Sequence, residues 1–291
     1  MELLLTLRKK DYLEKVIGMC DGVIIGSRFV SGYHLTLDDL ETINIRCKAE
    51  GCKVYIVMDN FISEDERMSM YEYLEFINEL EPDGIYFHDL GVFEAAGSCG
   101  LRSKLIYDGK TVLTNSLDSS FFLDQGIDSV VIARELTLDE IKQIVRRNDG
   151  KVDMQIFGHL RMSYSRRRFL TNYFKEIGKE YDYLGRETLT LIEEKREYRM
   201  PIVEDEAGTM IYSDYILEMF SELPELRPYL KRGIIDTLFI EDVNKIVSIC
   251  REYRRVTKEN SEFLKKSFIR NYPDSYSSGY LYQRTNISKD E

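Results

Sequence analysis

Four arginines within eight residues are the most unusual feature of this sequence. Arg161, Arg166, Arg167 and Arg168 follow an apolar run in the segment IFGHLRMSYSRRRFLTNYF (156–174), in a chain whose formal net charge is −11. Guanidinium groups bind phosphates and carboxylates through paired hydrogen bonds, and they stack on nucleobases. A solvated helix face is the simpler alternative. The choice between an anion-binding or RNA-binding surface and a solvated face depends on where this segment lies in the fold.

Other residues that could take part in catalysis come directly after short apolar runs. His88 and Asp89 are adjacent, and a neighbouring carboxylate can hold the tautomer of an imidazole for acid–base catalysis. The alternative is a histidine that is simply hydrogen-bonded at a strand end. Arg134, Glu135 and His159 are further catalytic candidates by position.

Motifs of known hydrolases and metal centres are absent from the sequence. It contains no H-E-x-x-H zinc motif and no G-x-S-x-G nucleophile elbow. The cysteines are odd in number and include no C-x-x-C pair: Cys20, Cys47, Cys52, Cys99 and Cys250. We therefore expect reduced, buried thiols and no metal site, including at Cys47 and Cys52.

Short runs rich in Val, Ile, Tyr and Phe predict the strands that would position these residues. They lie at 3–7, 22–27, 53–59, 84–89, 104–108, 129–135, 152–158 and 236–242. Each run is apolar on both faces, which is typical of a parallel sheet covered by helices. Between the runs, three helices have capping-box signals that begin at Thr36, Ser63 and Thr137.

Eight strands that alternate with helices predict an α/β fold of the (β/α)8 type, a TIM-like barrel. An open doubly wound sheet is the alternative, but no G-x-G-x-x-G turn follows the first strand. In a barrel, the loops that follow the strands form the face where sites are built. The residues expected there are Ser27, Arg28, Asp59, Asn60, His88, Asp89, Asp108, Arg134, Glu135, His159, Glu241 and Asp242.

One spacing breaks the regular alternation. Strands through the middle of the chain start 20 to 31 residues apart, but the last two predicted strands start at residues 152 and 236. This gap predicts an α+β insertion after strand seven, at about 159–232, with an antiparallel turn at Asp205–Gly208 and a helix over SDYILEMFSELPEL. The barrel domain would cover 1–255, and the tail at 256–291 would pack on it. The arginine cluster would then hang over the barrel mouth.

Composition sets the broad class of protein. Hydrophobic residues make up 43% and charged residues 31%, as in a globular protein with a sizeable core. The sequence shows neither a membrane-spanning run nor a signal peptide, so we expect a cytoplasmic protein without a membrane partner. A pI near 5.0 argues against a general nucleic-acid coat protein, but one local basic site would act over a Debye length of about 8–10 Å.

Several longer segments together resemble peptidase family U32, the collagenase-like proteases. They are MQIFGHLRMSYSRRRFLTNYF, EEKREYRMPIVEDEAGTMIYS and LKRGIIDTLFIEDVNKIVSICREYR, with MELLLT at the start and SGYLYQRT in the tail. The resemblance covers most of the chain. Its short single-barrel form is similar to the branch linked to hydroxylation of tRNA wobble uridines.

That resemblance implies a role in forming 5-hydroxyuridine at uridine-34, with prephenate as the hydroxyl source. It implies tRNA and a cluster-bearing U32 paralogue as partners. Related branches act on ribosomal RNA or ubiquinone precursors. Two alternatives stay open, namely a collagenase-like peptidase and an inactive barrel that serves as a binding subunit. Whether this chain catalyses the reaction itself is also left open.

The sequence departs from the family pattern at the ligands of the iron–sulfur cluster. Hydroxylating relatives carry a pattern like H-G-x-x-C-x-x-Y-S-x-R-C, whose cysteines hold the cluster. Here Gly158, Tyr164, Ser165 and Arg167 match. Phe157 occupies the histidine position, and Arg161 and Arg168 occupy the two cysteine positions. Arginine offers only donors, so no bound cofactor is expected. The candidates for binding substrate or RNA are Asn60, Arg161, Arg166, Arg167, Arg168 and Arg199, and those for the prephenate carboxylates are Arg134, Arg167 and Arg199.

If the arginine cluster were structural instead, its expected partners would be carboxylates of the same insertion. Glu193, Glu194 and Glu197 are the nearest acidic residues of that kind in the sequence.

Overall fold

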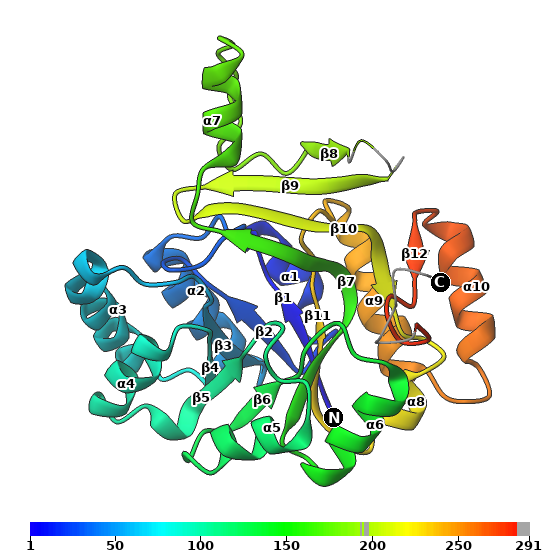
Figure 1. Cartoon of the computed structure of the whole chain (residues 1–291). Helices are drawn as coiled ribbons and strands as arrows, with labels where there is room; N and C mark the ends of the chain where they lie inside the picture. Colours follow the sequence, from blue (N-terminus) through cyan, green and yellow to red (C-terminus); the bar gives the residue numbers. More distant parts are fainter. Residues whose placement is uncertain (193, 195–197, 284–291) are drawn as a thin grey trace.

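Eight parallel strands close into a barrel (Figure 1). The computed structural model describes residues 1–192, 194 and 198–283. The barrel strands are β1 (Glu2–Thr6), β2 (Gly22–Ile25), β3 (Lys53–Met58), β4 (Gly84–Phe87), β5 (Leu105–Asp108), β6 (Ser129–Val131), β7 (Val152–Ser165) and β11 (Leu230–Ile235). Each pairs with its neighbour in chain order, and β11 pairs with both β7 and β1. The predicted TIM-like barrel is confirmed.

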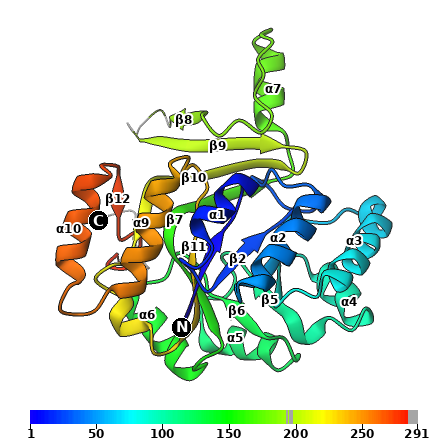
Figure 2. The same cartoon turned by 180° about the vertical axis from the view of Figure 1, so that it is seen from behind.

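Helices surround the barrel on its outside (Figures 1 and 2). They are α1 (Leu13–Val16), α2 (Leu37–Ala49), α3 (Arg67–Leu80), α4 (Leu90–Ser98), α5 (Ser116–Leu123), α6 (Leu138–Arg147) and α9 (Val243–Arg255), with short 3-10 turns η1 (Lys10–Tyr12), η2 (Glu64–Glu66) and η3 (Arg102–Lys104). The three predicted capping boxes form at Thr36, Ser63 and Thr137. No helix in the described part of the chain is both long and apolar enough to cross a membrane.

The predicted position of the eighth strand is wrong. The strand is β11, and the run at 236–242 is instead part of the loop above it. Thr237 fixes the start of this loop by donating its hydroxyl to the carbonyl of Thr6 at 2.7 Å. Arg232 makes β11 difficult to recognise as a strand from the sequence, because a charged side chain is not expected inside a barrel. In the structure, Arg232 is only 4% exposed.

The insertion after the seventh strand begins within β7 itself. Gly158 has a φ of +115°, and a Cβ atom there would collide with the backbone carbonyl of Asp236. Only glycine therefore allows β7 to leave the barrel wall at this point. The rest of the insertion is formed by α7 (Phe169–Glu176), β8 (Thr190–Ile192), β9 (Arg199–Asp205), β10 (Gly208–Glu218) and α8 (Leu223–Leu226).

The strands of the insertion form an antiparallel sheet over the barrel. β10 pairs with the outgoing half of β7 and with β9, so the predicted turn at Asp205–Gly208 is confirmed. The helix predicted over 213–226 is largely wrong, because β10 continues to Glu218 and α8 covers only four residues. Figure 1 shows β9 and β10 lying across the top of the barrel, with α7 projecting away from it.

The described part of the C-terminal tail packs against the barrel and the insertion. It contains α10 (Ser261–Asn271) and β12 (Tyr276–Ser277), which pairs with β10. Leu264, Phe268 and Leu281 are buried in the main core.

An apolar layer fills the middle of the barrel interior. Its buried side chains are Leu4, Ile24, Tyr55, Val57, Tyr86, Ile106, Val131 and Ile234. This layer separates two groups of buried charges, one at each end of the barrel. Such layering is typical of barrels whose interior is packed rather than open.

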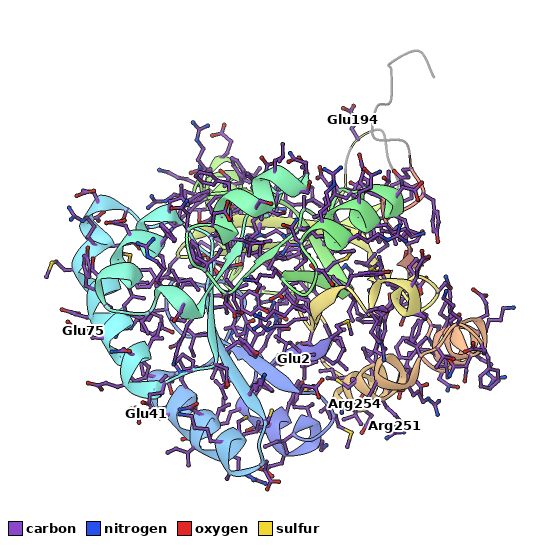
Figure 3. The ribbon with its side chains drawn as sticks, turned by 90° about the horizontal axis from the view of Figure 1, so that it is seen from below. Glu2, Glu41, Glu75, Glu194, Arg251 and Arg254 are labelled. Carbon is purple, nitrogen blue, oxygen red and sulfur yellow. The ribbon has the colours of Figure 1, made fainter. Side chains whose placement is uncertain are left out.

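Arg232 is the centre of the charge group at the N-terminal end. Its guanidinium lies 2.7 Å from Asp128 and 3.1 Å from Asp153, and Nε donates to the hydroxyl of Tyr55. The same hydroxyl donates to Glu2, which Figure 3 shows at this end of the barrel, viewed from below. Here carboxylates surround Arg232 and satisfy its donors, and Lys53 and Lys231 pair with two of the same carboxylates, so the charges of this plug balance.

We predict that Arg232→Met destabilises the protein by about 3–5 kcal/mol, because it leaves the fully buried Asp153 without its cation. Lys231→Met is the matched control, since Lys231 pairs with Asp128 but is partly exposed, and it should cost about 1 kcal/mol or less. Urea unfolding followed by circular dichroism measures both changes. Equal losses in the two variants would contradict the proposed role of Arg232.

Candidate active site at the barrel mouth

A buried cavity of about 80 Å³ lies at the C-terminal end of the barrel interior. It is strongly charged, and its cationic side chains outnumber its carboxylates by four to three. The cations are Arg8, Lys110, Arg134 and Arg161, and the carboxylates are Asp59, Asp108 and Asp236. In contrast to the plug at the other end, the cavity can accept one more negative charge.

Lys110 lies between two of the carboxylates. Its Nζ is 2.6 Å from Oδ2 of Asp108 and 3.0 Å from Oδ2 of Asp59. Burial lowers the pKa of Lys110 despite these partners. The backbone at Lys110 has a φ of +58°, a left-handed conformation that is strained for a residue with a side chain. The β5–α5 loop therefore holds this ammonium group in place at a conformational cost.

Arg134 and Arg161 complete the pairing of the same two carboxylates. Arg161 Nη1 lies 3.2 Å from Asp59, and Arg134 Nη2 lies 3.2 Å from Asp108. Burial by itself would raise the pKa of Asp59, but Lys110 and Arg161 lower it to about 2. The pKa of Asp108 is lowered further, against the same effect of burial, by Lys110 and Arg134. Both carboxylates are therefore ionised at neutral pH.

Arg8 forms the opposite wall of the cavity. Its Nη2 lies 2.8 Å from Asp236, Nη1 donates to the carbonyl of Gly32, and the guanidinium lies over the ring of Tyr33. Tyr212 of β10 covers the cavity from the insertion side. Arg8 Nε and Asp59 Oδ1 are buried polar atoms without a protein partner among the described residues. Buried polar atoms of this kind usually meet a ligand or water.

His88 and Asp89 do not form the predicted acid–base pair. His88 Nδ1 donates to the backbone carbonyl of Asp108 at 2.9 Å. Asp89 instead accepts from the amides of Gly91 and Ile62 and so caps α4. His88 is thus a histidine that is hydrogen-bonded to the backbone at a strand end, which is the alternative to an acid–base pair. Its ring still faces the mouth region.

The remaining catalytic candidates lie outside the cavity, except for Arg134. Glu135 is exposed in the β6–α6 loop. His159 donates through Nδ1 to the carbonyl of Ser213 at 2.7 Å and packs edge-on against Phe239. Burial lowers the pKa of His159, so its imidazole is neutral. Of the predicted site residues, Arg134 and Arg161 meet in this cavity, whereas His88 and Asp89 meet Arg161 in a neighbouring outer pocket.

The candidates for RNA binding, apart from Arg161, lie above the cavity. Asn60 is buried and accepts from the hydroxyl of Ser31. Arg166 is half-exposed, 3.8 Å from Glu66. Arg167, Arg168 and Arg199 are exposed; Arg168 precedes α7, and Arg199 begins β9. Of the carboxylates that could pair with the cluster, Glu193 and Glu197 lie outside the described residues, and Glu194 is exposed.

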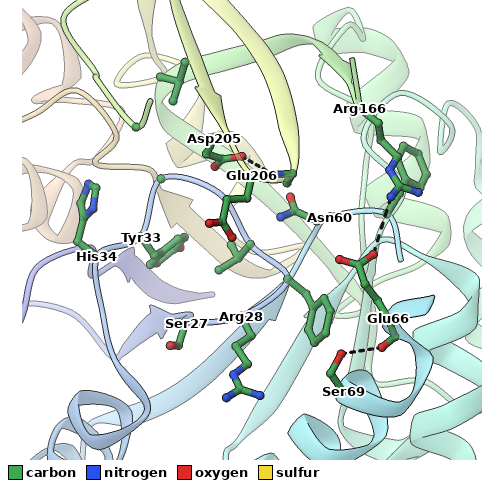
Figure 4. A pocket seen from close by; sticks show the side chains of 17 residues that line it. Ser27, Arg28, Tyr33, His34, Asn60, Glu66, Ser69, Arg166, Asp205 and Glu206 are labelled. Carbon is green, nitrogen blue, oxygen red and sulfur yellow. Dashed lines mark hydrogen bonds and ion pairs between the residues drawn. The ribbon is translucent and has the colours of Figure 1, made fainter. Parts of the chain in front are cut away.

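Two outer pockets flank the cavity. One, of about 600 Å³, lies between the β2–α2 and β3–α3 loops and the β9–β10 turn (Figure 4). The other, of about 570 Å³, lies beside His88 and shares Lys110 and Arg161 with the cavity. Phe61 lines both pockets and separates them.

Arg8, Lys110 and Tyr212 are not among the residues that the sequence singles out. Arg8 and Lys110 each follow a barrel strand by two residues, and that spacing is the signal that could have found them. Tyr212 reaches the mouth from β10, far along the chain, and only the folded insertion places it there.

The residues at this mouth do not fit an iron–sulfur cluster. Arg161 is paired with Asp59 inside the cavity, and Arg168 is exposed. Cys20, Cys47 and Cys52 lie against one another at the opposite end of the barrel. No group of three or more His, Cys, Asp or Glu side chains in the described residues is arranged to hold a metal ion.

The fold and the mouth define a TIM-barrel protein with a buried, cation-rich cavity under an inserted sheet. The chain belongs to peptidase family U32, whose model matches residues 20–290. The resemblance seen in the sequence is confirmed. The solved structure of the U32 peptidase Mk0906 shares this fold, with a TM-score of 0.51 and 15% identity over 81% of this chain and 92% of that one.

Curated relatives carry different names. The chain is 30% identical to tRNA hydroxylation protein P2 of Bacillus subtilis over 72% of its own length and 68% of that protein. It is 28% identical to an uncharacterized protease of Methanocaldococcus jannaschii, over 82% of this chain and 61% of the relative. It is 23% identical to the 23S rRNA 5-hydroxycytidine synthase of Escherichia coli, over 55% of this chain but only 24% of the relative. The chain therefore spans only part of these longer proteins.

We predict that the stabilising effect of Asp59 depends on pH. Its folded-state pKa of about 2 lies below the value near 3.9 of an unfolded chain, so its stabilisation is present above pH 4 and lost as pH falls toward 2. Asp59→Asn should therefore be less stable than the natural protein by about 2 kcal/mol at pH 6, and the gap should close on acidification. Urea unfolding at a series of pH values measures the gap.

The exposed Asp149 provides the control for this experiment. Asp149→Asn should track the natural protein at every pH. A gap for Asp59→Asn that stayed constant down to pH 3 would show that the ion pairs with Lys110 and Arg161 do not hold the carboxylate ionised.

Proposed function

We propose that this chain is a component of prephenate-dependent tRNA hydroxylation, in which uridine-34 becomes 5-hydroxyuridine. The observation that carries the proposal is the buried cavity whose cations outnumber its carboxylates. Relatives named tRNA hydroxylation proteins P1, P2 and P, and one named as an rRNA hydroxycytidine synthase, support an RNA base as the substrate. The proposal places the protein in the cytoplasm.

The charge of the cavity suits a carboxylate ligand. Because the cavity is buried, an uncompensated cation there lacks the solvation that water would provide. A carboxylate of prephenate would restore the balance and could take paired hydrogen bonds from a guanidinium. Arg134 is the best-placed candidate, since it reaches into the cavity and is held by Gln155 at 3.0 Å and Asp108 at 3.2 Å.

A partner chain would supply what this mouth does not. The side chains at the mouth do not fit the role of ligands to an iron–sulfur cluster, and the hydroxylating branch of the family uses such a cluster. We therefore propose a U32 paralogue that carries the cluster, with tRNA bound across both chains. The role of this chain would be to hold the cosubstrate and part of the RNA.

The arginine cluster provides a surface for RNA next to the cavity. Arg166, Arg167 and Arg168 are exposed where β7 passes into α7, above the mouth. Phosphate contacts from such side chains position an RNA without reading its sequence. The acidic remainder of the chain limits this contact to the mouth, because charges act over only about 8–10 Å at physiological salt.

A peptidase has less support in the structure. Among the described residues, His88 and His159 use Nδ1 to bind backbone carbonyls, and His34, which lines the pocket of Figure 4, pairs through Nε2 with Glu187 at 3.2 Å. None of the three histidines is hydrogen-bonded to a serine, threonine or cysteine side chain in that part of the chain. No observation at the mouth favours hydrolysis over ligand binding by its cations.

We predict that a strain lacking this gene loses 5-hydroxyuridine and its derivatives at the wobble position of tRNA. Arg134→Met should fail to restore them, because it removes a cavity cation that we assign to the cosubstrate. Arg146→Met is the control, since Arg146 is exposed on α6, and it should restore them fully. Mass spectrometry of digested tRNA measures each strain, and thermal unfolding checks that both variants fold.

The outcomes separate the remaining alternatives. Full restoration by Arg134→Met would show that the chain serves as a binding subunit without a working cosubstrate site. Unchanged 5-hydroxyuridine in the deletion strain would overturn the proposed function.

We predict that replacing Arg166, Arg167 and Arg168 with alanine weakens tRNA binding and makes it less dependent on salt. Each lost contact to a single-strand phosphate should reduce the slope of log affinity against log salt by about 0.7. The fold should survive, because exposed charges contribute little stability. Binding is measured by fluorescence anisotropy over a range of salt concentrations, with the partner chain present.

The control replaces three arginines on the opposite side of the protein. Arg251, Arg254 and Arg255 lie on α9, and Figure 3 shows the first two at the lower face. Their replacement should leave the salt slope unchanged. An unchanged salt slope in the variant that lacks Arg166, Arg167 and Arg168 would show that these arginines are a solvated surface without an RNA contact. Loss of folding in that variant would show that they have a structural role.

A further inference from the structure

The outer pocket beside His88 has the size and lining of a ligand site. This His88 pocket, of about 570 Å³, falls within the 300–1,000 Å³ range that is typical of small-molecule sites. The loops after β3, β4 and β5 and the outgoing half of β7 enclose it. Phe61, Tyr107 and Tyr164 give it aromatic walls, and the exposed side chains of Leu90 and Val112 form its rim.

Phe61 is a stacking surface at the edge of this pocket. Its ring is 44% exposed, lies parallel to Tyr164 with centroids 5.5 Å apart, and contacts His88 at 4.8 Å. A large aromatic ring that is held by two neighbours and still open to solvent provides a rigid platform. Nucleobases stack on such platforms with a substantial gain in affinity.

The floor of the His88 pocket offers hydrogen-bond donors. Lys110 and Arg161 line both this pocket and the buried cavity. Among the described residues, Asp59 is the only carboxylate within ion-pair distance of Arg161, although a guanidinium carries five N–H groups. Donors therefore remain for a ligand that presents carbonyl oxygens.

His88 offers an acceptor instead. Its Nδ1 faces the backbone carbonyl of Asp108 at 2.9 Å, so this nitrogen must carry the proton. Burial lowers the pKa of His88, which keeps the ring neutral and leaves a lone pair on Nε2. In the described part of the chain, Nε2 has no protein partner and is not among the buried unpaired atoms. It is therefore open to a donor that enters the pocket.

We infer that the His88 pocket binds a uracil base turned out of an RNA loop, stacked on Phe61. Uracil presents an N–H group between two carbonyl oxygens, which matches an acceptor at His88 with donors at Lys110 and Arg161. Cytosine would place its own N3 lone pair against that of His88. The inference rests on the proposed function, and it assigns the base to this pocket and the carboxylate of the cosubstrate to the adjoining cavity.

The larger pocket of Figure 4 is less suited to a nucleotide. Glu66, Asp205 and Glu206 line it, against Arg28 and Arg166. Its carboxylates would repel the phosphates on either side of a flipped base. Among the described residues that line the His88 pocket, Asp89 is the only carboxylate, and both of its oxygens accept hydrogen bonds from backbone amides.

Photo-cross-linking tests the placement of the base. An anticodon stem-loop RNA with 5-iodouridine at the wobble position is bound to the chain with its partner, irradiated, and mapped by mass spectrometry. We expect cross-links at Phe61, Tyr164 or His88, and none there from an RNA with 5-iodouridine in the stem. Cross-links confined to other parts of a chain that binds the RNA would overturn the inference and leave the proposed function standing. Failure to bind tRNA at all would overturn both.

Two substitutions give an independent measurement. Phe61→Ala removes the platform and should weaken binding of the loop RNA about five- to hundredfold. Phe121→Ala is the matched control, because Phe121 is an exposed phenylalanine on α5 outside the pocket. His88→Ala should narrow the preference for an RNA with uridine over one with cytidine at the wobble position. Equal affinities for the two RNAs in the unmodified protein, or an unchanged preference in His88→Ala, would contradict the assigned base edge.

Discussion

Lys110 holds its ammonium group inside the barrel between Asp59 and Asp108, and the mouth is organised around this contact. Charges buried in a barrel need compensation, because the surrounding side chains solvate them poorly. Arg134 and Arg161 then pair with the same two carboxylates from neighbouring strands. The result is a network in which every carboxylate is shared and one positive charge is left over.

At the opposite end of the barrel, the buried charges balance. There Arg232, Lys53 and Lys231 pair with Asp128, Asp153 and Glu2, which makes three cations against three carboxylates, and the hydroxyl of Tyr55 satisfies Nε of Arg232. Among the described residues, that group contains no excess of positive charge that would favour an anionic ligand. The difference between the two ends is therefore one of charge balance, and it supports the proposal that the mouth is the end that binds an anion.

The inserted sheet turns the mouth from an open rim into an enclosed site. β7 leaves the barrel wall at Gly158, and its outgoing half carries Arg161 into the cavity and Tyr164 against Phe61. β10 returns beside it and places Tyr212 over the cavity. One bent strand thus contributes to the buried charge network, to the stacking surface and to the exposed arginines. This arrangement links the proposed carboxylate site, the proposed base pocket and the proposed RNA surface within one face.

The sequence by itself determined the barrel, because buried parallel strands and capped helices leave local patterns of apolar residues and cap residues. It also predicted the antiparallel turn at Asp205–Gly208 and placed Arg134 and Arg161 at the mouth. It misplaced the eighth strand, since a buried Arg232 looks like a surface residue until its carboxylate partners are known. The tertiary structure decided which charges meet: Arg8, Lys110 and Asp236 come from separate loops, and their pairing depends on how the ring of strands closes. Whether a histidine faces a carboxylate or a backbone carbonyl, as at His88, is likewise a matter of orientation that spacing along the chain does not encode.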